Sequence, residues 1–239
     1  EGPGIRWDGL PDRIDAVIGE RIARLPSTLQ QFLATASVEG EAFTLEAAAR
    51  VQGVDAQDLI ETVSRELERR HRLVVAQGVR RLGGKRLSVY RFRHNLFQRF
   101  LYDQLDEVEK AHAHEQVGMA LEALHGDHVE EIALELARHL KAAGRPHEAA
   151  KYTLSAGKRA LLGGAVREAL LHLEDSVRLL RSPPASPERD AQELETQLAL
   201  GNARHMAADP GQEEAFRRAL ELAEGLGDPF RLGRAIHGL

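Results

Sequence analysis

The feature that most constrains the fold is a change in hydrophobic period between residues 73 and 94. Two β-branched and aromatic runs lie there, "RLVVAQGVRRL" and "RLSVYRFRH", and they flank the segment "GGKR". Alternation of this kind around paired glycines predicts a β-hairpin that turns at Gly83 and Gly84. Apolar residues on both sides of this segment recur at helical spacing. We therefore expect a mainly α-helical chain in which this small hairpin is the only sheet.

The segment before the hairpin predicts four helices. The first covers residues 10–25, with Leu10 on its apolar stripe and Pro11 at its entry, and the second follows Pro26 with Ser27 as its cap. A short third helix ends at Gly53, and Asp55 caps a fourth that runs to residue 71. After the first helix, the remaining three helices and the two-stranded hairpin follow the order of a winged helix. Residues 1–105 are therefore interpreted as a lid-type helix and a winged-helix domain.

From residue 106 onward the pattern is helical and resembles tetratricopeptide hairpins. Such hairpins place small residues where their two helices touch. Two overlapping sets meet that pattern: Gly157, Ala169 and Ser176, and Ala137, Ala149 and Ala156. The sets are offset by 20 residues instead of about 34, which predicts an irregular array.

The helical region divides at a Pro-rich segment. We assign 106–181 to tetratricopeptide-like hairpins, 182–188 ("SPPASPE") to a linker, and 189–239 to further helices of the same kind, with Gly201 and Ala219 in small-residue roles. The start lacks methionine and the end falls within a helical pattern, so we expect a fragment of a longer protein.

Composition excludes several classes of site. The chain has no cysteine, so it has neither disulfides nor a thiolate zinc site, and its default location is the cytoplasm. No apolar run is long enough for a membrane span, and no membrane partner is expected. The histidines are scattered, without an HExxH motif, so we expect no metal site. No nucleophile, base and orienting group can be assembled, so we expect no enzymatic activity in this chain.

A run from residue 69 to 94 contains basic side chains and no acidic one. Such a patch attracts phosphate, and in a winged helix it favours DNA binding. However, the helix that would enter the major groove begins with Asp55, Asp58 and Glu61, which would repel the duplex. Contact with an acidic partner domain, a bound nucleotide and simple solvation are the other readings. The candidate phosphate or nucleic-acid patch comprises Arg69, Arg70, Arg80, Arg81, Lys85 and Arg86.

Lys85 also belongs to a glycine-rich segment, "GVRRLGGKRLS", that superficially resembles a phosphate loop. The true motif needs Ser or Thr after the lysine and must run into a helix. Here Arg86 follows and the context is a hairpin, so the segment is interpreted as a turn.

His94 stands where the second strand ends and a helix begins. Alternation places it on the face of Tyr90 and Phe92, and Asn95 is expected to cap the helix. There the imidazole would lie beside the free N–H groups and positive dipole of the helix, which favour an anion. The alternative is a partly buried histidine stacked on Tyr90 and Phe92.

A family resemblance is carried by three segments: "LPDRIDAVIGERIARLPSTLQQFLATASVEGEAF", "YRFRHNLFQRFLYDQL" and "ELARHLKAAGRPHEAAKYTLSAGKRAL". Together they resemble the region after the nucleotide-binding core in bacterial STAND ATPases, which are signal-transduction ATPases with numerous domains. "ALGNARH" and "RRALELAEGLGDP" are similar to helical repeats in members fused to adenylate/guanylate cyclase or transcriptional-regulator domains. The likeness covers nearly the whole chain.

The resemblance implies a role for His94. In related NB-ARC proteins a Met-His-Asp motif lies at this joint, and its histidine contacts the phosphate of bound ADP. Here Arg93 replaces the methionine and Asn95 the aspartate, so only the histidine carries over, with Arg93 and Asn95 as support. The implied parent protein binds ATP or ADP with Mg²⁺, while this fragment alone binds no cofactor.

The expected function is therefore that of a non-catalytic regulatory fragment. Its winged helix would contact the nucleotide-binding domain of the same protein and sense its nucleotide state, and its repeats would bind an unknown protein partner. The alternative is a DNA-binding winged-helix transcriptional regulator with a tetratricopeptide-like effector region. Binding to duplex DNA that weakens steeply with salt would favour this alternative.

Overall fold

The computed structural model describes residues 12–182, 184 and 186–239, and it divides into two compact units, 1–126 and 127–239. The two units are described separately. Leu10 and Pro11, which belong to the first predicted helix, lie outside the described residues. The fold is mainly α-helical with a small antiparallel sheet near the N-terminus.

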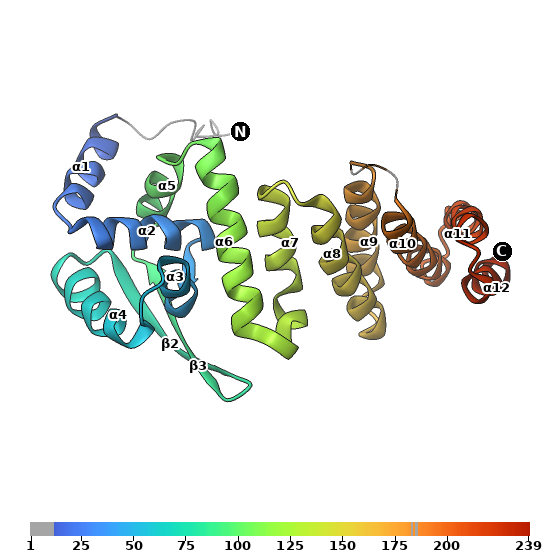
Figure 1. The fold of residues 1–239 in the computed structure, drawn as a ribbon, viewed down its shortest axis with the longest axis horizontal. Coiled ribbons are helices and arrows are strands. Elements are labelled where there is room, and N and C mark those ends of the chain that lie inside the picture. The colour runs from blue at the N-terminus through green and yellow to red at the C-terminus, as the bar shows by residue number, and fades with distance from the viewer. Residues whose placement is uncertain (1–11, 183, 185) are drawn as a thin grey trace, which may run out of the picture. The chain divides into compact units, whose positions relative to one another are not determined.

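The first unit contains the predicted helices and hairpin in the predicted order (Figure 1). Its elements are α1 Asp12–Ala23, α2 Ser27–Glu39, β1 Ala42–Thr44, α3 Leu45–Gln52, α4 Ala56–Thr62, a π-helical segment Val63–Arg70, β2 Val74–Leu82, β3 Lys85–Phe92, α5 Asn95–Asp103 and α6 Glu107–His125. The hairpin turns at Gly83 and Gly84, whose φ angles of 53° and 81° lie in the left-handed region. Two such residues match the twist of the strands they join.

The sheet has three strands in the order β1-β3-β2, so the expectation that the hairpin is the only sheet is wrong. β1 pairs antiparallel with β3 and sets Phe43 opposite Tyr90. The strand was missed because only three residues form it, too few for an alternating pattern. β2 occupies the other edge and carries a bulge between Ala76 and Gly78.

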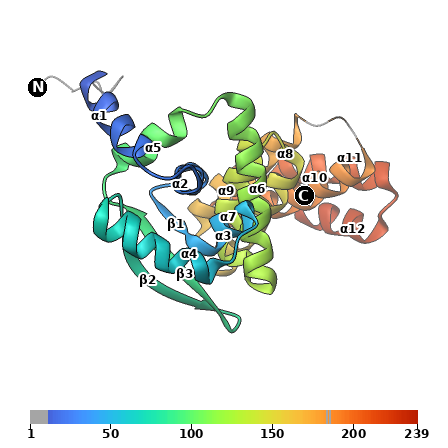
Figure 2. The same ribbon diagram turned by 60° about the vertical axis from the view of Figure 1, so that its left-hand side comes forward.

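The core of the first unit lies between the helices and one face of this sheet (Figure 2). Phe43 is fully buried, and its ring centroid lies 5.3 Å from that of Phe92 and 5.8 Å from that of Phe32. Phe43 comes from β1, Phe92 from β3 and Phe32 from α2. Burial of aromatic rings from three elements therefore joins the short strand to the hairpin and to the helical layer.

Some of the residues predicted to cap or end the helices do so, and others do not. Asp55 caps α4 by accepting a hydrogen bond from the Gln57 N–H at 2.7 Å, and Gly53 ends α3 with a φ of 67°. The capping expectations for Ser27 and Asn95 are wrong, because both are the first residues of their helices and Pro26 and His94 precede them. The fourth predicted helix also changes form, since α4 continues as the π-helical segment.

α6 belongs to the first unit, although its sequence pattern joins it to the helical array. It packs against α2 and α3, and it begins with a capping box between Asp106 and Glu109. At its other end the Lys85 Nζ donates hydrogen bonds to the carbonyl oxygens of Ala123 and Leu124, at 3.3 and 3.0 Å. The hairpin tip is thereby attached to the last turn of α6.

The second unit is entirely helical in its described residues, with each helix packed on the next (Figure 1). A 3₁₀ helix, Gly126–Ile132, leads into it. The remaining elements are α7 Ala133–Ala142, α8 Pro146–Leu162, α9 Val166–Leu180, α10 Pro187–Met206, α11 Gln212–Leu226 and α12 Pro229–Gly238. α10 begins at Pro187, within the predicted linker 182–188.

Small residues lie where these helices touch, as the repeat pattern predicts. A Cβ on Gly157 of α8 would lie 2.7 Å from the Cγ of Leu173 in α9, and a Cβ on Gly201 of α10 would lie 2.7 Å from the Phe216 ring in α11. Ala137 of α7 and Ala149 of α8 are buried in one cluster. α8 therefore uses small residues toward both of its neighbours, which accounts for the two overlapping matches in the sequence.

Candidate functional site

The candidate site is the joint between β3 and α5, where His94 is the N-cap residue. Its backbone is extended, with φ −135° and ψ 137°, and its side chain makes no capping hydrogen bond. The imidazole is exposed, so the expectation that it shares the core-facing side with Tyr90 and Phe92 is wrong. The alternation stops because β3 ends at Phe92, two residues before His94.

The Phe97 ring lies beside His94, and an arginine of α1 contacts the same ring. The centroid of the His94 ring lies 6.1 Å from that of the buried Phe97 ring, and the guanidinium carbon of Arg21 lies 5.0 Å from the same Phe97 centroid. Arg21 also donates a hydrogen bond to the His71 carbonyl oxygen at 2.6 Å. α1 thus brings a positive charge to the Phe97 ring of α5, and nothing in the sequence near His94 indicates this contact.

Two further arginines lie at this end of the sheet. The Arg93 N–H donates to the Leu73 carbonyl at 2.8 Å, which places Arg72, the residue before Leu73, beside the joint. Arg72 has a φ of 51°, a strained conformation for a residue with a long side chain. Among the described residues neither side chain has an acidic partner. The nearby Glu41 pairs instead with Arg91, at 3.1 Å.

These residues make the joint a favourable place for an anion. The free N–H groups at the start of α5 and the positive end of its dipole point toward it. Among the described residues no hydrogen bond occupies the ring nitrogens of His94, so the imidazole can donate one to a ligand. Arg21 and Arg93 add positive charge, and Asn95 stands at the first helical position.

The candidate basic patch is not a single site. All six of its side chains are exposed, but Arg69 and Arg70 lie at the base of the hairpin and the other four lie near its tip. β2 separates the two groups by roughly 25 Å at the usual rise per residue. Arg70 pairs with Glu66 at 3.0 Å, and this hydrogen bond holds the pKa of that carboxyl below its ordinary value.

At the tip of the hairpin, two side chains of the same charge face each other. The register sets Arg81 directly across from Arg86, an arrangement that disfavours the pair unless a ligand or solvent neutralises it. Lys85 is engaged with the α6 carbonyl groups, and the residues around it form a hairpin turn, as predicted. This segment therefore lacks the helix that a phosphate loop needs.

The buried histidines have structural partners. The Nε2 of His114 lies 3.0 Å from the Tyr102 hydroxyl, the Nδ1 of His125 lies 2.9 Å from the Leu121 carbonyl oxygen, and the Nε2 of His139 accepts from Arg138. Within residues 12–182, 184 and 186–239 no group of three His, Cys, Asp or Glu side chains could hold a metal ion.

No protein family, no curated protein and no solved structure matches this chain. Across the part of the chain that the structure describes, no helix combines the length and the apolar character that crossing a bilayer requires.

Proposed function

We propose that this chain is a non-catalytic regulatory part of an ATP-dependent signalling ATPase. In this proposal α2, β1, α3, α4 and the β2–β3 hairpin form a winged helix that contacts the nucleotide-binding domain of the same protein. The order helix, strand, helix, helix, hairpin supports this assignment. The second unit is a tetratricopeptide-like scaffold for a protein partner, and the close contacts at Gly157 and Gly201 support that part.

The observation that carries the proposal is the exposed His94 at the N-terminus of α5. An imidazole there can donate a hydrogen bond to a phosphate supplied by a neighbouring domain, because no group among the described residues competes for it. Arg21 and Arg93 would add attraction for the same anion. The histidine would then report whether a phosphate is present, and the winged helix would be held or released accordingly.

The test is the release of ADP from the full-length protein with His94→Ala. Losing one charge-assisted contact should weaken ADP retention by about 1.5 to 3 kcal/mol, roughly a tenfold to hundredfold faster release. His112→Ala is the matched control, since His112 is an exposed histidine of α6 in the same unit. Equal ADP release from wild type and a folded His94→Ala variant would contradict the proposal.

A DNA-binding regulator is the second candidate, favoured by the exposed arginines Arg80, Arg81 and Arg86 on the hairpin. The structure adds a difficulty for it. Asp55, Asp58 and Glu61 are exposed at the start and end of α4, the helix that would enter the major groove. Three carboxylates beside phosphate groups would oppose binding, so we favour the nucleotide-state sensor.

A further inference from the structure

The second unit contains a groove of about 580 Å³ over α10, flanked by α9 and α11. Its lining is mainly polar and includes more arginines than carboxylates. The charged residues that line it are Arg181, Arg189, Glu193, Arg204, Glu214, Arg217, Arg218 and Glu221. The five arginines outnumber the three glutamates, although the whole chain has a net charge of −5.

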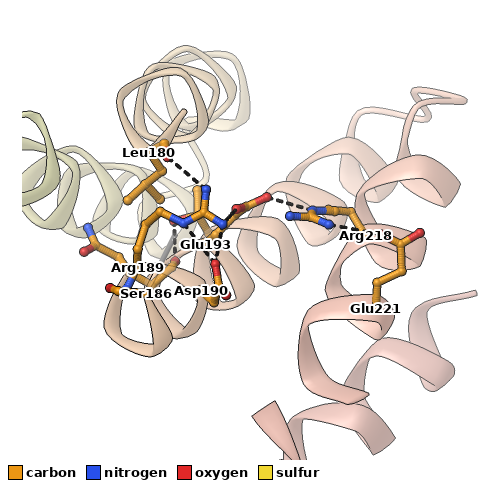
Figure 3. A network of polar contacts seen from close by, with 9 residues as sticks. Leu180, Ser186, Arg189, Asp190, Glu193, Arg218 and Glu221 are labelled. Carbon is orange, nitrogen blue, oxygen red and sulfur yellow. Dashed lines mark hydrogen bonds and ion pairs between the residues drawn. The ribbon is translucent and has the colours of Figure 1, made fainter. Parts of the chain in front are cut away.

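The groove is pre-organised by a set of charge pairs centred on Glu193 (Figure 3). This carboxylate is buried and accepts a hydrogen bond from the Arg218 Nε at 2.8 Å, while the Arg189 Nη2 lies 3.5 Å away. Arg189 also pairs with Asp190, and Arg218 with Glu221 at 3.1 Å. Arg189 and Arg218 are therefore held by carboxylates of α10 and α11, which keeps the walls in place.

Gln197 is the feature that points to a ligand. Its side chain lines the groove and is only 8% exposed, yet it has no hydrogen-bond partner among the described residues. Its amide atoms are not sealed off, since they retain contact with the open space of the groove. A primary amide offers two donors and one acceptor, and with no protein partner these groups are free to pair with a ligand in place of water. A ligand that supplies a peptide group would satisfy it.

Around the Gln197 amide, the charged side chains that lack a strong partner carry more positive than negative charge. Arg181 is exposed without an acidic partner in the described chain, and Arg217 has only a surface pair with Glu213, in which both side chains are 64% exposed. Such pairs contribute little and exchange readily. Glu214 is the one lining carboxylate without a partner among the described residues. An anionic ligand would thus gain two arginines and meet one carboxylate.

We infer that this groove binds an acidic, extended peptide segment of a partner protein. Gln197 pairs with the peptide backbone, and Arg181 and Arg217 pair with carboxylate side chains. The inference rests on the scaffold role proposed above and names the surface and chemistry of the partner. The lining arginines exclude basic segments by like-charge repulsion.

The experiment measures fluorescence anisotropy of labelled hexaglutamate with the 239-residue protein at low salt, with hexaglutamine and hexalysine as comparison peptides. Of the three peptides only hexaglutamate should bind, and its binding should weaken as the salt concentration rises. Arg181→Ala and Gln197→Leu should each weaken it about tenfold. Glu214→Gln should strengthen it, since a repelling charge is removed. Arg167→Ala, an exposed arginine at the other end of α9, should change nothing.

The inference would be overturned if hexaglutamate did not bind at low salt, or if wild type and Arg181→Ala bound it with equal affinity. It would also be overturned if free glutamate displaced the labelled peptide as effectively as unlabelled hexaglutamate does, because that result would indicate a small-anion site. Arg181 is exposed, so its variant keeps the test valid if Gln197→Leu does not fold. A partner that binds the second unit elsewhere would defeat this inference alone. The scaffold role fails separately if deleting residues 189–239 leaves every interaction of the full-length protein unchanged.

Discussion

At the scale of single residues, the Phe216 ring occupies space that two glycines leave open. A Cβ on Gly201 would lie 2.7 Å from the ring, and a Cβ on Gly238 would lie 2.4 Å from it. Phe216 itself is 3% exposed, in a cluster that joins α10, α11 and α12. The close approach of these helices therefore depends on the absence of two side chains.

Gly201→Ala should consequently destabilise the second unit by about 1 to 3 kcal/mol, because the ring cannot move without disturbing its cluster. Urea unfolding followed by circular dichroism would measure the change. Gly225→Ala is the matched control. Gly225 lies within α11, a Cβ there would meet no atom of the described residues within 4 Å, and alanine should stabilise the helix by about 0.5 to 1 kcal/mol. Equal stability of Gly201→Ala and wild type would show that the ring adapts.

Residue-scale features were predictable where they depend on near neighbours in the chain. Gly201 could be identified because repeat spacing places small residues at helix contacts, and Asp55 because capping is local. The surroundings of His94 could not be predicted. Arg21 reaches the Phe97 ring from another helix, and the turn of His94 away from the core depends on where β3 stops. The sequence did not single out Gln197, because its lack of a hydrogen-bond partner depends on how the helices pack.

At the scale of elements, the hairpin tip is tied to α6 through Lys85. Its ammonium group donates to two carbonyl oxygens in the last turn of α6, which lack partners within the helix. A cation at this end is also favoured by the helix dipole.

Lys85→Met should therefore lower the free energy of unfolding of the first unit by about 0.5 to 1.5 kcal/mol and speed hydrogen exchange at the end of α6. Arg80→Met is the control, because Arg80 is an exposed cation of the same hairpin with no partner among the described residues. If both variants exchanged at the wild-type rate along α6, the two hydrogen bonds would contribute nothing to attachment.

Elements with a long periodic pattern were predictable, and short or context-dependent ones were not. The hairpin and its turn follow from alternation around two glycines. β1 did not follow, because three residues gain strand form only by pairing with β3. The sequence pattern also placed α6 with the array, since helical periodicity does not say which neighbour the apolar face meets.

At the scale of the whole molecule, three elements of the second unit are joined by one carboxylate. Glu195 of α10 accepts from Lys158 of α8 at 2.9 Å and from Arg231 of α12 at 2.5 Å. Burial acts to raise the pKa of Glu195, but the hydrogen bonds from Lys158 and Arg231 outweigh it and hold the pKa below its ordinary value.

A carboxyl with a lowered pKa stabilises the fold above its unfolded pKa, about 4.3, and the contribution disappears as pH falls through the folded value. Glu195→Gln should thus cost about 1 to 2 kcal/mol at pH 7 and progressively less below pH about 4. Urea unfolding across this pH range would measure it. Glu213→Gln, which loses only a surface pair, should cost less than about 0.5 kcal/mol. A loss for Glu195→Gln that did not change with pH would contradict this account.

The position of β2 has a consequence for how the protein behaves at high concentration. β2 lies at an edge of the sheet, where unpaired backbone groups invite strands of other molecules. The bulge at Ala76 interrupts this edge, Glu68 accepts the Ala76 N–H at 2.9 Å, and Arg80 and Arg81 add charge beyond it. Two copies approaching edge to edge would meet repulsion and mismatched spacing, so the same arginines protect the chain from polymerising whether or not they ever meet a ligand.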